Sequence, residues 1–338
     1  MILPCPRHAA RLALAALLAA AAGCGGRRGA QESAGTTPPD SAPAPAASAV
    51  PPPFGGAETP PDTIVHARAY RSVRIADPRA LRRLYRSLGA DRFLLALKVN
   101  RRDSLHVRNG DSLMVPDSTA TLLDLAPFPR QIPSTTELAK LILVSRRVQA
   151  FAAYEHGGLA RWGPTSTGRE SLQTPEGLYH TNWKDAERTS TFNEEWLLKW
   201  YLNLDNFLGI SFHLFELPGY PASHSCVRLL EDDAIWLYDW ADQWTLDTAD
   251  RRKVVKPGTP VVVFGRYAYG KKAPWRKLAA DSTATDVPLA EIEAALTQYL
   301  RSGRPTPIDS LRVATLLAIQ RARRARAAAA AESAARPR

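Results

Sequence analysis

Residues 209–230 read GISFHLFELPGYPASHSCVRLL, and the interpretation of the rest of the chain depends on this stretch. It contains Cys226, with His213 and His224 upstream and Arg228 just after it. A cysteine is a nucleophile only as its thiolate, so a reactive cysteine needs a nearby imidazole or a positive charge. This stretch supplies both. The alternative is a buried structural cysteine whose neighbouring histidines are incidental.

The segment around the cysteine, YPASHSCVRL at residues 220–229, resembles the signature of the L,D-transpeptidase (YkuD-type) family, usually SHGCxR. The resemblance extends over roughly residues 141–265 and includes three further motifs in the family's order: TSTG at 165–168, TPEG at 174–177 and GTPVVV at 258–263. One position departs from the signature, because Ser225 stands where the family usually has glycine. If that position has a positive φ, a serine there adds strain of about 1 kcal/mol.

This resemblance implies roles for four residues. Cys226 is the expected nucleophile, and His213, on a strand, deprotonates the thiol and later protonates the departing amine. The second nitrogen of this imidazole needs an acceptor, which in the family is a backbone carbonyl and here is that of Leu214. His224 is expected to shape the site, either through a direct proton role or by orienting its loop with a hydrogen bond.

Two further roles concern the oxyanion and the substrate. Backbone N–H groups around Ser225 and Cys226 are expected to form an oxyanion hole, in which one donor contributes about 2–4 kcal/mol to the barrier. Arg228 either binds a carboxylate of the substrate bidentately or pins its loop to the sheet. No cofactor and no metal ligand is expected.

The resemblance also implies a mainly β fold, an L,D-transpeptidase-like β-sandwich with a flanking helix, over residues 138–267. Apolar runs separated by Gly and Pro predict strands at 141–154 (two strands with a turn at 145–147), 159–162, 177–182, 210–214 and 260–264. A helix is expected at 232–244, with Asp232 or Asp233 as N-cap. The Trp- and Tyr-rich residues 183–206 are either a lid or substrate groove, or a helix packed on the sandwich.

The N-terminal residues 1–24 have the features of a lipoprotein-type signal peptide. Arg7 and Arg11 are followed by the apolar run 12–22, which is shorter than the roughly 20 residues that span a bilayer. The run ends in AAGC, which resembles a lipobox whose Cys24 is lipidated. The alternative is an ordinary cleaved secretory signal, and both imply export.

Cysteine use agrees with export. The chain has three cysteines. Cys5 leaves with the signal peptide and Cys24 carries the lipid, so Cys226 has no partner for an internal disulfide. A single remaining cysteine in an exported protein indicates a reactive thiol or an intermolecular bond.

Two regions precede the catalytic domain. Residues 25–62 are rich in Pro and Ala and predict a disordered linker. Residues 63–120 predict a small α+β region, with a helix at 77–88 and a turn at Asn109–Gly110 between two strands. The sequence NGDSLMVP, which begins at this turn, resembles the second half of a LysM module, which binds cell-wall glycan, so contact with glycan is expected there.

Residues 268–338 predict a helical, basic C-terminal extension. Helices are expected at 288–300 and 308–330, and the Arg- and Ala-rich tail from Arg321 contributes to the net charge of +11. Such a tail is expected either to bind an anionic membrane or acidic wall polymers, or to be a solvated helix without a partner. Export excludes nucleic acid as a partner.

Together these features predict a protein of the cell envelope, lipid-anchored to a membrane and facing the periplasm or the wall. Its expected function is peptidoglycan L,D-transpeptidation on stem peptides, through a cysteine acyl-enzyme and with release of terminal D-Ala. The same thiol can serve an L,D-carboxypeptidase or a hydrolase. A candidate from another class is a non-catalytic wall-binding lipoprotein with a decayed site, which Ser225 favours.

Overall fold

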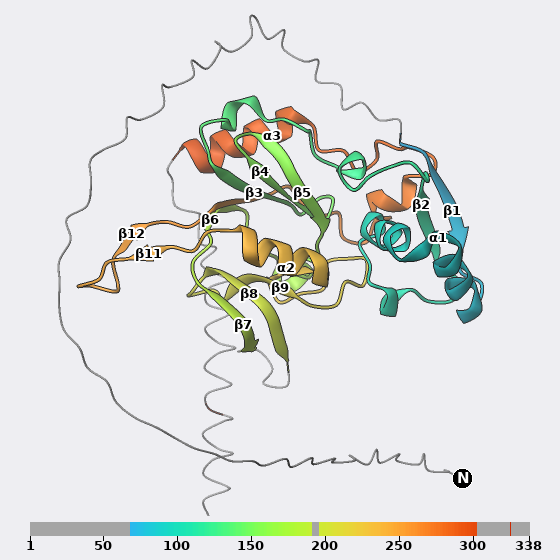
Figure 1. Ribbon diagram of the computed structural model, residues 1–338, viewed down its shortest axis with the longest axis horizontal. Coiled ribbons are helices and arrows are strands. Elements are labelled where there is room, and N and C mark those ends of the chain that lie inside the picture. The colour runs from blue at the N-terminus through green and yellow to red at the C-terminus, as the bar shows by residue number, and fades with distance from the viewer. Residues whose placement is uncertain (1–67, 191–195, 303–324, 326–338) are drawn as a thin grey trace, which may run out of the picture. The chain divides into compact units, whose positions relative to one another are not determined.

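The computed structural model describes residues 68–190, 196–302 and 325 (Figure 1). The predicted signal peptide, with Cys24, and the Pro/Ala-rich linker lie outside the described residues, as does all of the predicted helix at 308–330 except Ala325. Among the described residues, no helix is both long and apolar enough to cross a membrane.

A five-stranded sheet with the order β5-β4-β3-β13-β6 forms the first layer of the fold. Its strands are β3 (Lys140–Ser145), β4 (Ala150–Glu155), β5 (Gly158–Pro164), β6 (Gly177–His180) and β13 (Pro260–Phe264). Strand β13 is parallel to β3 and antiparallel to β6. The predicted strands of this sheet are therefore confirmed.

The central strands of this sheet are continuous apolar runs because both of their faces are covered. Leu141 and Leu143 of β3 pack into one hydrophobic cluster, and Ile142 and Val144 pack into another on the opposite face. This alternation follows from the two-residue period of a strand. The sheet therefore separates two cores.

A second sheet, of order β10-β9-β8-β7, covers one face of the first. Its strands are β7 (Lys184–Thr189), β8 (Leu197–Asp205), β9 (Ile210–Leu214) and β10 (Val227–Leu229). Phe212, Val227 and Leu202 point into the core between the sheets, together with Leu237 of helix α2 (Glu231–Trp240). The prediction of a mainly β fold with a helix after the cysteine motif is confirmed (Figure 1).

Two details of these elements differ from the predictions. The helix considered for residues 183–206 is wrong, because β7 and β8 pair as an antiparallel hairpin. The N-cap of α2 is Leu230, without a side-chain cap, and neither Asp232 nor Asp233. Both aspartates lie in the first turn, where their charge favours the helix dipole, and both form ion pairs.

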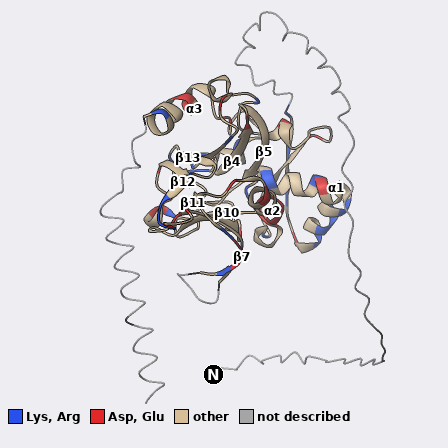
Figure 2. Cartoon of the chain, turned by 60° about the vertical axis from the view of Figure 1, so that its left-hand side comes forward, with Lys and Arg blue, Asp and Glu red and all other residues tan. Residues whose placement is uncertain are grey.

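The region before the sandwich contains one long helix and a two-stranded antiparallel sheet: β1 (Tyr70–Arg74), α1 (Pro78–Val99) and β2 (Ser112–Pro116). Asp77 caps α1 by accepting a hydrogen bond of 2.7 Å from the Ala80 amide. Basic side chains occur along α1 (Figure 2). The predicted end at residue 88 coincides with a break at Gly89, whose φ of 73° is not helical, and a second helical segment follows it as far as Val99.

The Asn109–Gly110 turn joins different elements from those predicted. The strand after it is β2, as expected, but the segment before it contains the 3-10 helix η1 (Ser104–His106). Strand β2 pairs instead with β1, which precedes α1 in the chain. The strand partner comes from before the helix because the apolar side chains of α1 pack against β2 in one cluster.

Ion pairs join α1 to the sandwich. Lys98 and Asp233, both almost fully buried, form one such pair, and Lys98 also contacts Asp232 at 2.8 Å. Arg161 of β5 contacts Asp233 at 2.8 Å. Breaking a buried pair of this kind leaves an uncompensated charge, so this contact fixes the end of α1 against α2.

Residues 268–302 cover the other face of the five-stranded sheet. They include η5 (Pro274–Lys277), α3 (Leu289–Ala295) and the π-helix η6 (Leu296–Arg301). Trp275, Ile292 and Leu296 pack into the same cluster as Leu141 and Leu143. The short remaining elements are η2 (Leu123–Leu125), η3 (Pro133–Thr135), η4 (Glu170–Leu172), β11 (Thr245–Leu246) and β12 (Val254–Lys256).

Candidate active site

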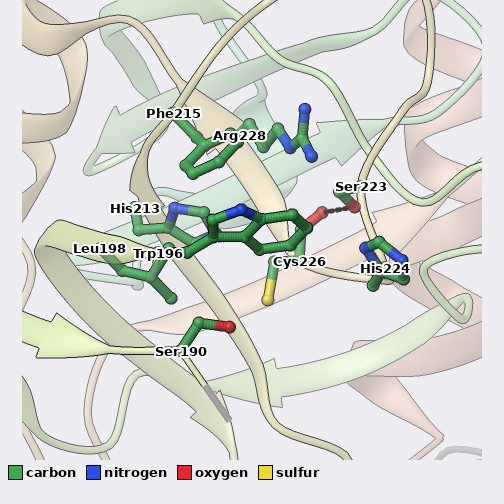
Figure 3. Close-up of a pocket in the computed structure, with 9 residues that line it drawn as sticks. All are labelled: Ser190, Trp196, Leu198, His213, Phe215, Ser223, His224, Cys226 and Arg228. Carbon is green, nitrogen blue, oxygen red and sulfur yellow. Dashed lines mark hydrogen bonds between the residues drawn. The ribbon is translucent and has the colours of Figure 1, made fainter. Parts of the chain in front are cut away.

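A pocket at the edge of the second sheet brings together the predicted site residues (Figure 3). Its lining consists of two histidines, the cysteine, an arginine, two serines and three apolar side chains: Ser190, Trp196, Leu198, His213, Phe215, Ser223, His224, Cys226 and Arg228. Of the predicted catalytic and binding residues, Ser225 is absent from this lining, and its side chain is buried behind the pocket.

Parallel pairing of β9 with β10 explains why the cysteine and the histidine meet. The register places Arg228 opposite His213, and Cys226 is the residue immediately before β10. Cys226 Sγ donates a hydrogen bond of 3.3 Å to the Gly209 carbonyl, and Ser211 Oγ donates one of 3.4 Å to the sulfur. These two contacts position the sulfur in the lining of the pocket.

Ser211 was not among the predicted site residues. It lies two residues before His213 on β9, and residues two apart on a strand share a face. The alternation Ser211–His213 against the apolar Ile210 and Phe212 was visible in the sequence and could have identified it.

The imidazole of His213 is held in one tautomer. Its Nδ1 lies 3.0 Å from the Leu214 carbonyl, which can only accept, so the ring proton resides on Nδ1 and Nε2 carries the lone pair. This contact confirms the predicted role of the Leu214 carbonyl. The ring is stacked on Tyr201, with centroids 6.3 Å apart, and meets the edge of Phe215 at 5.8 Å.

Burial sets the protonation of this histidine. The pKa of His213 is lowered to about 4, mainly by loss of hydration; the hydrogen bond to Leu214 opposes this shift and the nearby Arg228 adds to it. The imidazole is therefore neutral at pH 7 and able to accept a proton.

A network of hydrogen bonds shapes the loop before the cysteine. Ser225 has a φ of 101°, which satisfies the condition under which a serine in place of glycine is strained. Its hydroxyl donates a hydrogen bond of 3.2 Å to the Leu172 carbonyl, which offsets part of that strain. Ser223 Oγ donates a bond of 2.5 Å to the Cys226 carbonyl.

One amide of the predicted oxyanion hole already donates a hydrogen bond within this loop. The backbone N–H of Ser225 donates a hydrogen bond of 3.1 Å to Ser223 Oγ. This amide is therefore engaged inside the loop, and a role toward an oxyanion requires this bond to break. This bond was not among the predictions from the sequence, in which Ser223 appears only as the first residue of the family signature.

The TSTG and TPEG motifs pack directly against the cysteine loop. Ser166 and Arg228 exchange two backbone hydrogen bonds of 3.1 Å, and the Ser223 amide donates to the Thr167 carbonyl at 3.0 Å. Thr174 Oγ1 donates a bond of 2.8 Å to the carbonyl of Ser225. The motifs that carry the resemblance therefore form one supporting layer behind the thiol.

Arg228 combines features of both predicted roles. Its guanidinium lies over the ring of Phe215, 4.4 Å from the centroid, and Nη1 donates a hydrogen bond of 3.4 Å to the Glu216 carbonyl. The side chain also lines the pocket (Figure 3). Burial lowers the pKa of Arg228, and the nearby Glu216 carboxylate opposes this shift. A cation held this way can meet an anionic group beside the sulfur.

Trp196, at the start of the β8 arm of the hairpin, contributes the large aromatic surface of the pocket. Its ring centroid is 5.5 Å from that of Phe215 and 5.7 Å from that of His224. In Figure 3 it lies across the pocket between His213 and His224. Of the alternatives for residues 183–206, a substrate groove agrees with this position.

Comparison with known proteins concerns the central part of the chain. Residues 139–263 match the model of the YkuD family, described as the L,D-transpeptidase catalytic domain. No curated protein matches the chain.

Among solved structures, an L,D-transpeptidase from Stackebrandtia nassauensis is 22% identical, with a TM-score of 0.31, covering 38% of this chain and 57% of that one. L,D-transpeptidase 1 of Mycobacterium tuberculosis is 22% identical, with a TM-score of 0.29 and coverages of 38% and 62%. An L,D-transpeptidase from Xylanimonas cellulosilytica is 21% identical, with a TM-score of 0.35 and coverages of 58% and 98%. The chain spans less than two thirds of the length of the first two.

Proposed function

We propose that this protein is a peptidoglycan L,D-transpeptidase that acts through a Cys226 acyl-enzyme. The observation that supports this most directly is the hydrogen bond of His213 Nδ1 to the Leu214 carbonyl, which leaves Nε2 as a base in the pocket of the thiol. The match of residues 139–263 to the L,D-transpeptidase catalytic domain supports the same reaction.

In the first half of the reaction, His213 Nε2 takes the thiol proton as Cys226 Sγ attacks the carbonyl of the third residue of a donor tetrapeptide stem. The bond to the terminal D-Ala breaks, its amine takes the proton from His213, and a thioester remains on Cys226. In the second half, an acceptor amine attacks the thioester carbonyl, its proton passes to His213, and the thiol is regenerated as the cross-link forms.

The walls of the pocket suit such a substrate. The guanidinium of Arg228 offers two parallel N–H donors to a carboxylate of the stem peptide, such as that of the terminal D-Ala. The rings of Trp196 and Phe215 offer apolar surface on the other walls and reduce the access of water to the thioester. Transfer to an amine then competes with hydrolysis.

Export, the lipid anchor at Cys24 and contact of residues 63–120 with wall glycan are parts of the same proposal. They rest on the sequence features of residues 1–24 and on the partial LysM resemblance. Export to the cell envelope would place the enzyme beside the stem peptides that are its proposed substrates.

A second candidate function, an L,D-carboxypeptidase, uses the same acyl-enzyme with water as acceptor. The non-catalytic wall-binding lipoprotein is less well supported, because the strained Ser225 is accommodated by its bond to the Leu172 carbonyl. A decayed site would also be expected to have lost one of its polar groups.

Incubation of the full chain in detergent with disaccharide-tetrapeptide muropeptides, followed by mass spectrometry, tests the proposal, with Cys226→Ala as control. Loss of D-Ala with formation of dimers, absent from the control, is the expected result. Loss of D-Ala without dimers indicates the carboxypeptidase. Unchanged muropeptides, and failure of meropenem to add its mass to Cys226, contradict a catalytic function.

A further inference from the structure

The segment that follows the catalytic histidine is fastened by the N-terminal region of the chain. Residues 215–219 leave β9 just after His213 and Leu214 and lead to the cysteine loop. The Asp103 amide donates a hydrogen bond of 3.0 Å to the Leu217 carbonyl, and the Leu217 amide donates one of 2.7 Å to Asp103 Oδ2. Arg102 and Pro218 form an adjacent antiparallel bridge.

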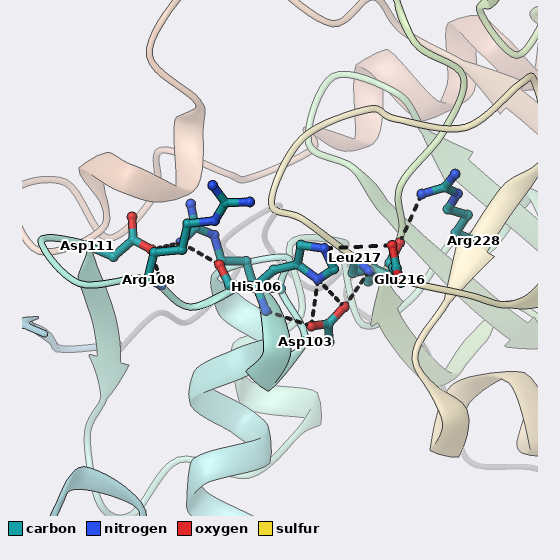
Figure 4. Close-up of polar contacts among 8 residues, drawn as sticks. Asp103, His106, Arg108, Asp111, Glu216, Leu217 and Arg228 are labelled. Carbon is teal, nitrogen blue, oxygen red and sulfur yellow. Dashed lines mark hydrogen bonds and ion pairs between the residues drawn. The ribbon is translucent and has the colours of Figure 1, made fainter. Parts of the chain in front are cut away.

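The same segment, residues 215–219, also contacts Arg228 (Figure 4). The carbonyl of Glu216, the residue before Leu217, accepts the hydrogen bond from Arg228 Nη1 at 3.4 Å. Phe215, one residue earlier, supports the other side of the guanidinium. The segment that Asp103 holds therefore supplies both an acceptor and a platform for the cation of the pocket.

Asp103 is itself held in place. Its Oδ1 accepts hydrogen bonds from the His106 amide at 2.9 Å and from His106 Nδ1 at 2.8 Å, while His106 Nε2 lies 3.7 Å from the carboxylate of Glu216. The end of α1, which precedes Asp103 in the chain, is fixed to the sandwich by the buried ion pair of Lys98 with Asp233. The carboxylate thus connects two rigid parts of the molecule.

We propose that Asp103 is a positioning residue, which holds the Glu216–Leu217 turn so that Arg228 binds an anionic group beside the Cys226 thiol. In the transpeptidation reaction this group is a carboxylate of the stem peptide, and to that extent the inference rests on the proposed function. The N-terminal α/β region is then part of the active site through this contact, independently of any glycan that it binds.

The test compares two alkylating reagents on the full chain. Iodoacetate carries a carboxylate and iodoacetamide is neutral, and in both reactions the Cys226 thiolate displaces iodide and forms an S–CH₂ bond. The rate with iodoacetate divided by the rate with iodoacetamide does not depend on the fraction of thiolate, because both reagents react with the same thiolate. This ratio therefore measures the effect of the cation beside the sulfur. Arg228→Gln removes the guanidinium that attracts the carboxylate of iodoacetate. We expect the ratio in this variant to be about fivefold lower than in the wild type.

Asp103→Ala is expected to bring the ratio down at least halfway to that of Arg228→Gln. Asp103→Glu, which keeps the charge but moves the oxygens away from the Leu217 amide, is expected to do the same, and it serves if the alanine variant does not fold. Asp103→Asn keeps an acceptor oxygen for Leu217 and should remain at the wild-type ratio. Asp77→Ala removes a similar carboxylate–amide bond from the start of α1, away from the pocket, and should leave the ratio unchanged.

A wild-type ratio in both Asp103→Ala and Asp103→Glu overturns the inference, as does a fall in Asp77→Ala of the same size, which indicates a general loss of stability. These rates do not depend on muropeptide turnover. A chain that forms no cross-links but shows the expected ratios contradicts the proposed function alone. A chain that forms cross-links with an unchanged ratio in the Asp103 variants contradicts only the positioning role.

Discussion

The buried imidazole of His213 makes a quantitative prediction about stability. Its pKa is about 4 in the folded protein, whereas an unperturbed histidine has a value near 6.5. Between these two values the unfolded chain binds more protons than the folded one, so the free energy of unfolding rises with pH through this window. The contribution of His213 is complete above about pH 6.5 and is lost as the pH falls toward 4.

The size of this contribution follows from the difference of about 2.5 pKa units, each equivalent to about 1.36 kcal/mol. Between pH 7 and pH 4, the wild type should lose about 3 kcal/mol more than a variant that has no imidazole at this position. The side chain is only 4% exposed, so little solvent screening reduces this figure.

Urea unfolding of the wild type and His213→Gln at several pH values between 4 and 8 measures this difference. Other groups titrate in both proteins, so the difference between the two curves isolates His213. The glutamine variant is expected to have the flatter curve, with the two curves separating below about pH 6.5. Parallel curves over the whole range would refute the reasoning, because the imidazole would then be hydrated in the folded protein.

Substitutions at three further positions test the packing around the site. Ser225→Ala keeps the positive φ but loses the bond to the Leu172 carbonyl, so it should lower the free energy of unfolding by about 1 kcal/mol, whereas Ser225→Gly should be nearly neutral in the same urea titration. Lys98→Met leaves the Asp233 carboxylate buried without its lysine and should cost about 3 kcal/mol; an unchanged thermal midpoint contradicts this. Gly168→Ala places a Cβ 2.1 Å from the Leu172 carbonyl oxygen, so it should lower the free energy of unfolding by about 2 kcal/mol. It should also change the rate at which iodoacetamide alkylates Cys226. A wild-type rate contradicts the supporting role of the TSTG motif.

Local patterns in the sequence predicted most of the sandwich. Strands β3 and β13 are runs of branched apolar residues, and this composition indicates a strand that is covered on both faces. The helix after the cysteine was predicted to within a few residues, although its cap was not. In α1, the predicted end at residue 88 coincides with the break at Gly89, whereas the second helical segment, which packs against β2 and ends at Val99, was not predicted.

The sequence by itself determined which groups take part in the site: a thiol, an imidazole on a strand, and a guanidinium after the cysteine. The family resemblance also implied the acceptor for His213, the Leu214 carbonyl, and the contact in the folded chain fixes the tautomer. Only the tertiary structure decided the burial that lowers the pKa of this imidazole and the bond from the Ser225 amide to Ser223.

The tertiary structure alone also decided that Asp103 holds Leu217, 114 residues away, and that Lys98 pairs with Asp233, 135 residues away. Periodicity and neighbouring residues determine a local conformation, because each depends on a few dihedral angles and on one face of one element. Contacts between distant segments depend on strand register and on the docking of whole elements, and no local pattern encodes these.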